Sequence, residues 1–189
     1  GLGLIRQLRK VHTRYNLFCF TIRKRLLGFE MANQFIQRVD KESVQFILKK
    51  NGATIGKNCD LETGITFHNC KDYSHLVIGK NCHIGKNCFF DLQDKVEIGN
   101  NVVISMQCTF ITHINMNQSP LSERYPASAS PIVIHDNVYL GANVTVLMGV
   151  RINKDALVAA KSLVRNSVER SAVVAGIPAK SIQKDIQGR

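Results

Sequence analysis

The chain has 189 residues, of which 44% are hydrophobic and 21% charged, and its formal net charge is +11. This length suits one domain with a substantial core and a small appendage, and this composition excludes a disordered chain. No apolar run approaches the ~20 residues that a helix needs to cross a bilayer, so we expect no transmembrane helix.

Residues 1–52 are predicted to form a basic helical segment. Residues 1–50 hold eleven Lys and Arg against three acidic residues, which accounts for most of the net charge. Apolar residues recur at helical spacing over 4–29 and again over 31–52. Such a charge run is most often the solvated face of a packed helix. Its interleaved Tyr15 and Phe18 also make it a candidate contact for the inner membrane, whereas nucleic acid is not expected.

The apolar stretch NLFCF at 16–20 is too short for a signal peptide and runs directly into the basic residues IRKR. We therefore expect a cytoplasmic protein, with peripheral contact at the inner face of the membrane as the further option.

A six-residue repeat begins where the helical pattern ends. IGKNC occurs at 78–82 and again at 84–88, and each of ten such blocks opens with an aliphatic residue that is usually followed by a small one. The opening residues are Ile55, Ile78, Ile84, Ile98, Ile104, Ile134, Leu140, Val146, Ile152 and Val158.

A period of six is typical of a parallel β-helix, in which the opening aliphatic residues point inward and successive coils stack as parallel strands. Asn and Gly suit the corners because both tolerate a left-handed backbone. The predicted fold is therefore an all-β solenoid over 53–189. Its repeat is interrupted by an external loop at 114–131, and a cap at 171–189 closes it with a strand and a short helix.

Four of the six cysteines occupy the fifth place of a block, where other blocks have valine or another small residue: Cys59, Cys82, Cys88 and Cys108. A free cysteine packs as a small hydrophobe, and the spacing C-H-x4-C matches no usual zinc site. We expect these residues to fill the core in a reducing compartment, and we expect no metal.

Three segments carry a family resemblance: ITHINMN at 111–117, PIVIHDNVYLGANVTVLMGVRI at 131–152 and VVAGIPAK at 173–180. Over about residues 53–185 the chain resembles the hexapeptide-repeat acyltransferases, in particular the branch of maltose, galactoside and polysaccharide O-acetyltransferases. The resemblance implies a left-handed parallel β-helix, a homotrimer, acetyl-CoA as acyl donor, and an active site between each pair of neighbouring subunits.

The resemblance also implies roles for individual residues. His113 matches the family's general base, which takes a proton from the acceptor hydroxyl as that oxygen attacks the thioester without an acyl-enzyme. This chemistry is reasonable because free imidazole titrates near neutral pH. Asp91 and Asp94 lie near family positions that bind the sugar, although an acidic residue at a bend is more often a turn former.

Five residues match family positions that bind coenzyme A. Backbone N–H groups at Gly141 and Ala142 match the donors to the thioester oxygen. Ala142 and Ala160 match positions along the pantetheine arm, and Arg165 and Lys180 match basic contacts. The chain departs from the family at Lys161, which replaces a glycine, and at Asn115 and Asn117, which stand where the family has an acidic residue. We expect the acceptor to differ accordingly.

The function predicted from the sequence is an acetyl-CoA-dependent O-acetyltransferase acting on a sugar or polysaccharide precursor. N-acetylation of an amino sugar is the alternative, because the same base would serve an amine. A γ-class carbonic anhydrase is disfavoured because the histidines do not supply its three zinc ligands. A non-catalytic β-helix that binds through its basic N-terminus is a remote alternative.

Overall fold

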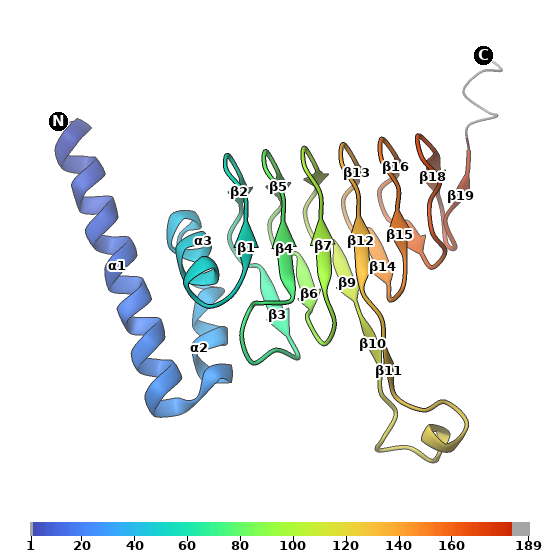
Figure 1. The fold of residues 1–189 in the computed structure, drawn as a ribbon, viewed down its shortest axis with the longest axis horizontal. Coiled ribbons are helices and arrows are strands. Elements are labelled where there is room, and N and C mark those ends of the chain that lie inside the picture. Colours follow the sequence, from blue (N-terminus) through green and yellow to red (C-terminus); the bar gives the residue numbers. More distant parts are fainter. Residues whose placement is uncertain (1, 183–189) are drawn as a thin grey trace.

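The computed structural model describes residues 2–182, which form three helices followed by short strands (Figure 1). The strands build three mainly parallel sheets and a separate two-stranded antiparallel sheet. The helices lie at one end of the stack, and a narrow arm made of β10 and β11 projects from its middle. The predicted short helix of the C-terminal cap falls at residues 183–189, outside the described residues. No helix in the described part of the chain combines the length and apolar character needed to cross a bilayer.

The N-terminal segment contains three helices where the sequence pattern indicated two: α1 (Leu2–Leu27), α2 (Phe29–Ile36) and α3 (Lys41–Lys50). The second predicted helix is divided because Asp40 has an extended backbone and its carboxylate accepts hydrogen bonds from the backbone N–H groups of Glu42 and Ser43. This is an N-cap, which begins a new helix rather than continuing the previous one.

Buried contacts join the helices to the first strands. The Asn33 amide donates to the Phe67 carbonyl at 2.7 Å and accepts from the Tyr73 hydroxyl at 3.0 Å. The Tyr73 ring also contacts Phe20 of α1 and Phe67, with centroid distances of 6.3 and 5.2 Å. The helical segment therefore shares one core with the sheets.

The chain visits the three sheets in turn. Sheet A contains, in order, β1 (Thr54–Ile55), β4 (Leu76–Ile78), β7 (Val96–Ile98), β12 (Ile132–Ile134) and β15 (Arg151–Ile152). Sheet B contains β2 (Asp60–Leu61), β5 (His83–Ile84), β8 (Val103–Ile104), β13 (Tyr139–Leu140), β16 (Leu157–Val158), β18 (Val173–Ala175) and the antiparallel β19 (Lys180–Ser181). Sheet C contains β3 (Thr66–His68), β6 (Phe89–Asp91), β9 (Thr109–Ile111), β14 (Thr145–Leu147) and β17 (Leu163–Val164).

The strand register matches the sequence repeat. In sheet A, Ile78, Ile98, Ile134 and Ile152 pair in succession, and each is at most 2% exposed. These are block-opening residues, so the stacked first positions form the core as predicted. Sheet C adds a stack of aromatic rings, in which Phe90 lies over Phe110 at a centroid distance of 4.7 Å.

Three corners separate the sheets, and we name each by the sheets it joins. At the A–B corner the side chains of successive left-handed residues form a hydrogen-bonded ladder. Its rungs are Asn58, Asn81, Asn101, Asn137 and Asp155, all with φ between 56° and 65°. Asn and Asp accept this conformation more readily than other non-glycine residues, which explains their place in the repeat.

The fifth-place cysteines confirm the packing interpretation. Cys82, Cys88 and Cys108 are buried, and Cys59 is partly buried against the core. The thiol of Cys82 donates to the carbonyl of Gly99 at 3.1 Å, and the thiol of Cys108 donates to that of Gly141 at 3.2 Å. Burial raises the pKa of the Cys82 thiol, which keeps it protonated as a donor.

Lys161 occupies a left-handed position at the B–C corner with φ of 61°, where the preceding coil has Asn143 with φ of 59°. A lysine lacks the short polar side chain that makes this conformation tolerable. We expect Lys161→Asn to raise the free energy of unfolding by about 0.5–1 kcal/mol, measured by chemical denaturation. Lys154→Asn, at an exposed position without positive φ, should leave stability unchanged. An equal effect at both positions would contradict the strain at Lys161.

Candidate active site

His113 lies where the chain leaves the repeat. It is the first residue of β10 (His113–Ile114), directly after the C–A corner that follows β9. β10 pairs antiparallel with β11 (Ser128–Ala129), and between them lies a short 3-10 helix, η1 (Pro120–Glu123). The predicted external loop is thus a two-stranded arm with an ordered tip (Figure 1). His113 stands at its base, and its side chain is 24% exposed.

Asp91 orients the imidazole. The distance between Nδ1 of His113 and Oδ2 of Asp91 is 2.6 Å. Asp91 is the last residue of β6, which lies in the coil before that of His113, and it is 2% exposed. It also accepts from the backbone N–H of Thr112 at 2.8 Å and from the Thr112 hydroxyl at 3.0 Å. Five groups hold this carboxylate, the other two donors being the amide of Asn69 at 3.2 Å and the backbone N–H of Gln93 at 3.3 Å.

These contacts decide the charge of Asp91. Burial raises its pKa, but hydrogen bonds from His113, Thr112 and Asn69 together outweigh burial and hold the pKa below its usual range. An ionised carboxylate can only accept hydrogen bonds. Nδ1 of His113 therefore carries the proton, and Nε2 presents a lone pair.

Asn69 defines the other side of the ring. Its amide nitrogen lies 3.2 Å from Nε2 of His113 and 3.2 Å from Oδ1 of Asp91. One NH₂ group has two protons and can donate to both acceptors. Asn69 has a left-handed backbone with φ of 52°, at the C–A corner that follows β3. The result is a partly buried network with a single tautomer, in which the Nε2 lone pair accepts from Asn69 and is the site on the ring that can take up a proton.

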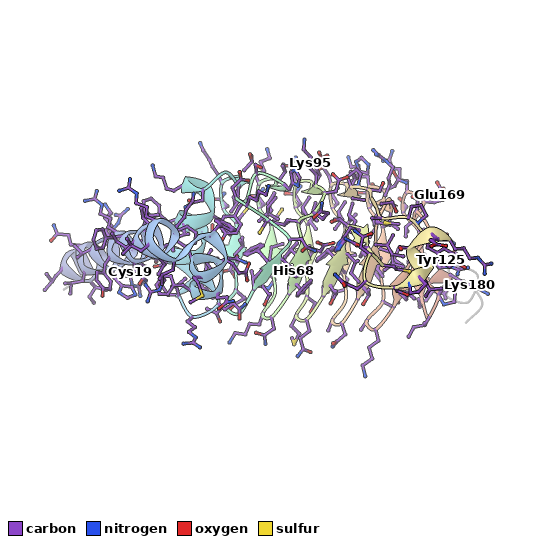
Figure 2. All side chains as sticks on the ribbon, turned by 90° about the horizontal axis from the view of Figure 1, so that it is seen from below. Cys19, His68, Lys95, Tyr125, Glu169 and Lys180 are labelled. Atoms are coloured by element: carbon purple, nitrogen blue, oxygen red, sulfur yellow. The ribbon has the colours of Figure 1, made fainter. Side chains whose placement is uncertain are left out.

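A polar pocket of about 570 Å³ opens beside Nε2. It is lined by His113 and Asn69 together with His68, Asn115, Met116, Asn117, Gln118 and Ser119. Figure 2, which views the molecule from the side of the arm, labels His68 of β3, the edge strand of sheet C next to the helices, and Tyr125 of the arm. Amide and hydroxyl groups dominate this lining, which suits a ligand with several hydroxyl groups.

The structure places the two predicted acceptor residues in different surroundings. Asp91 is buried behind His113 and reaches the pocket only through the imidazole. Asp94 is half-buried, and its carboxylate accepts from the backbone N–H of Lys95 at 2.7 Å, which is a local turn contact. Neither carboxylate lines the pocket beside Nε2.

The residues predicted to hold the acyl donor lie at the B–C corner. Gly141 donates its N–H to the Val158 carbonyl at 2.9 Å, so this N–H group is already occupied. A Cβ atom at Gly141 would lie 2.5 Å from the backbone nitrogen of Ala160, so only glycine permits the close approach of these coils. Ala142 lies half-buried beside it, and its N–H has no acceptor within residues 2–182.

The two predicted basic contacts are both exposed. Arg165 follows β17 at the C–A corner, and Lys180 lies on β19 at the far edge of sheet B. One chain therefore carries His113 at its C–A corner and Gly141, Ala142 and Ala160 at its B–C corner. The predicted base and the predicted thioester contacts do not meet within a single copy.

Two residues of this network were missed from the sequence: Asn69, which contacts His113 and Asp91, and Thr112, which donates to Asp91. The only signal for Asn69 was that FHNCKDYSHL at 67–76 disturbs the six-residue phase. The structure explains this disturbance, because the extra residues form the corner that brings Asn69 to the imidazole.

Comparisons with known proteins agree with this architecture. A family model described as the hexapeptide repeat of succinyl-transferase matches residues 75–107 and 131–161. The structure of a maltose O-acetyltransferase from Clostridium difficile 630 is similar with a TM-score of 0.69 and 23% identity, covering 79% of this chain and 80% of that one. A hexapeptide-repeat acetyltransferase from Vibrio cholerae is similar with a TM-score of 0.67 and 26% identity, covering 78% and 82%. The Vibrio protein is also known complexed with acetyl coenzyme A.

A curated relative is similar over a shorter stretch. The 2,3,4,5-tetrahydropyridine-2,6-dicarboxylate N-acetyltransferase of Staphylococcus aureus (strain JH9) is 52% identical over 59 residues, which is 31% of this chain. The match covers only 25% of that relative's length.

The chain therefore carries hexapeptide repeats at 75–107 and 131–161, and it has the fold of the solved hexapeptide-repeat acetyltransferases. The curated relative and the two solved structures described above are named acetyltransferases, whereas an N-acyltransferase from Bacillus cereus is also among the similar structures, with a TM-score of 0.58 and 18% identity over 71% of this chain and 76% of that one. Within residues 2–182, no three His, Cys, Asp or Glu side chains are placed to hold a metal ion.

Proposed function

We propose that this protein is an acetyl-CoA-dependent O-acetyltransferase that modifies a hydroxyl group of a sugar or polysaccharide precursor. The observation that carries the proposal is the Asp91–His113–Asn69 network, which fixes the imidazole with Nε2 as a proton acceptor beside a polar pocket. The sugar class is supported by the amide-rich lining and by the maltose O-acetyltransferase among the structural neighbours.

The reaction requires one base that acts twice. Nε2 of His113 takes the acceptor hydroxyl proton as the oxygen attacks the thioester carbonyl carbon of acetyl-CoA. The tetrahedral intermediate then expels the CoA thiolate, which recovers the proton from the imidazolium. The products are an acetyl ester and free CoA, and His113 returns to its starting state. Asp91 stabilises the imidazolium, so we propose a positioning role for it instead of direct sugar binding.

We propose that the complete site forms between neighbouring subunits of a homotrimer with a left-handed β-helix. Nε2 of His113 lies at one corner of the chain and the N–H of Ala142, the available oxyanion donor, lies at another. A second copy that places its B–C corner against the His113 pocket would unite them. In this arrangement Ala142 and Ala160 border the pantetheine arm, and Arg165 and Lys180 contact the anionic end of CoA.

Subunit mixing tests the shared site. His113→Ala removes the base, and Ala160→Trp, at an exposed position, blocks the B–C corner; each homotrimer should be inactive. Random mixed trimers would regain about a quarter of the wild-type sites, because each site takes one corner from each of two copies. No recovery in mixed trimers, whose formation is verified by affinity tags, would contradict a shared site.

The domain division that we propose keeps residues 1–52 as a helical segment and 53–189 as the acyltransferase domain.

N-acetylation is the second candidate function, because the curated relative from Staphylococcus aureus is named an N-acetyltransferase. The product distinguishes the two: mild alkali cleaves an acetyl ester and leaves an acetyl amide intact.

A further inference from the structure

Helix α1 has an inner and an outer face of different character. The inner face packs on α2 and α3 through Phe20, which is fully buried, and through Asn16, whose amide donates to the Ser43 hydroxyl at 2.9 Å. The outer face carries large apolar side chains that are 38% to 63% exposed. We call these residues the apolar stripe: Leu4, Leu8, Val11, Tyr15, Phe18 and Ile22.

The apolar stripe is continuous along the helix. Its members alternate at spacings of four and three residues, which places them on one side of a helix with about 3.6 residues per turn. On the same geometry the centre of the stripe is turned about 160° away from Phe20 and about 120° away from Asn16. The stripe therefore faces away from the protein core.

The charge around the stripe has one sign. Residues 2–27 contain no acidic residue and seven basic ones: Arg6, Arg9, Lys10, Arg14, Arg23, Lys24 and Arg25. The acidic groups that face α1 come from the inner side. Asp40 lies 3.1 Å from His12, and Glu42 lies 3.7 Å from Arg9. Lys10, Arg14 and Arg25 have no acidic partner among the described residues.

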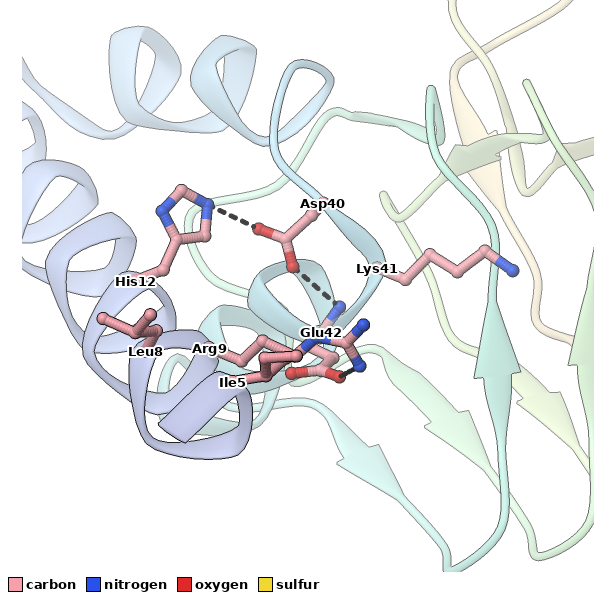
Figure 3. A pocket seen from close by; sticks show the side chains of 7 residues that line it. All are labelled: Ile5, Leu8, Arg9, His12, Asp40, Lys41 and Glu42. Atoms are coloured by element: carbon pink, nitrogen blue, oxygen red, sulfur yellow. Dashed lines mark hydrogen bonds and ion pairs between the residues drawn. The ribbon is translucent and has the colours of Figure 1, made fainter. Parts of the chain in front are cut away.

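A groove beside the start of α1 extends the apolar surface. Figure 3 shows Ile5 and Leu8 of α1 at this groove of about 580 Å³, with Asp40, Lys41 and Glu42 at the beginning of α3 on its other side. The acidic side chains of the rim are paired with His12 and Arg9 in this view. These acidic side chains therefore do not neutralise Lys10, Arg14 and Arg25, the basic residues that flank the stripe.

A second copy of the chain fits this surface poorly. Helices that pair through a stripe of this spacing place charged residues beside the seam, and attraction needs opposite signs there. Two α1 helices would bring only basic residues together. A surface that is both apolar and anionic satisfies the stripe and its flank at once, and an anionic lipid bilayer has this combination.

We propose that α1 binds anionic membrane surfaces, with its apolar stripe in the boundary between headgroups and acyl chains and its basic residues at the lipid headgroups. A helix of 26 residues is about 39 Å long and can lie flat on such a surface. Figure 1 shows α1 as the outermost element at the end of the stack opposite β18. Binding there leaves the arm and the His113 pocket accessible, and it does not depend on the proposed acetyl transfer.

Sedimentation of the full chain with lipid vesicles tests the proposal. The probes are vesicles of phosphatidylcholine alone and of equal parts phosphatidylcholine and phosphatidylglycerol. The double variant Leu8→Ser/Phe18→Ser removes part of the stripe. Leu121→Ser/Met106→Ser is the matched control, because it removes two equally large side chains that are each 53% exposed elsewhere. The variant Lys10→Gln/Arg14→Gln tests the charge.

The wild type and the matched control should bind the anionic vesicles and bind neutral vesicles weakly. The stripe variant should bind at least about tenfold more weakly, and each lost charge should weaken binding about fivefold. Binding of the stripe variant that equals that of the matched control would overturn the proposal. The proposal would also fail if the wild type stays in solution with the anionic vesicles. If the stripe variant then forms smaller oligomers than the wild type, a second copy of the chain covers the stripe.

Discussion

Replacing His113 with alanine is expected to lower kcat for acetyl transfer by about a thousandfold, which lies within the usual range for a lost general base. Binding of acetyl-CoA should remain within about twofold, because His113 acts on the acceptor proton and not on the donor. Release of the CoA thiol with a saturating sugar acceptor measures the first quantity, and calorimetric titration measures the second.

His68→Ala is the matched control for this loss, because His68 lines the same pocket and pairs with Asp91 through the strand backbone, but among the described residues no side-chain hydrogen bond joins the two. We expect it to change KM for the acceptor more than kcat. If His113→Ala and His68→Ala reduce kcat equally, the base assignment is wrong and His113 is only part of the pocket wall.

Asp91→Asn is expected to have the second largest effect, because it alters both the tautomer of His113 and the stability of the corner. An amide can place either its oxygen or its NH₂ group against Nδ1, so the preference for the tautomer with its lone pair on Nε2 is lost. We expect kcat to fall about a hundredfold. At neutral pH the free energy of unfolding should fall by about 2 kcal/mol, because a buried carboxylate that holds five donors is replaced.

The stability effect should depend on pH with a definite sign. The hydrogen bonds lower the pKa of Asp91 in the folded state below its value in the unfolded chain, which is about 3.9. The stabilisation is therefore present above about pH 4 and disappears as the pH falls through the folded-state pKa. Denaturation of wild type and Asp91→Asn should converge at acid pH. A constant difference down to the acid limit, or the same effect from Asp94→Asn, would contradict the ionised network.

Much of the fold could be predicted because the repeat is a direct physical signal. The block-opening Ile78 and Ile98 must point inward wherever coils stack, and corner residues such as Asn101 must accept left-handed geometry. The division between α2 and α3 was missed because the capping role of Asp40 is local, whereas apolar spacing runs across it.

The candidate site was only partly predictable because its contacts join residues from successive coils. His113 could be selected only through the family resemblance, which places the general base before the external loop. Its contact with Asp91, however, spans 22 positions and its contact with Asn69 spans 44. The pairing with Asn69 depends on how the extra residues at 67–76 shape the corner between sheets C and A. Where the six-residue repeat is interrupted, the sequence does not show which residues of successive coils lie side by side.

The most direct measurement is the transfer of acetyl from acetyl-CoA to a panel of sugars, with the release of CoA and the acetylated product followed together by mass spectrometry. The proposed function predicts one acetyl group per CoA released, a product that mild alkali cleaves, and loss of both signals in His113→Ala. An alkali-stable product formed from amino sugars would replace the hydroxyl acceptor with an amine. Absence of acetyl-CoA binding by the wild type would contradict the acetyltransferase function itself.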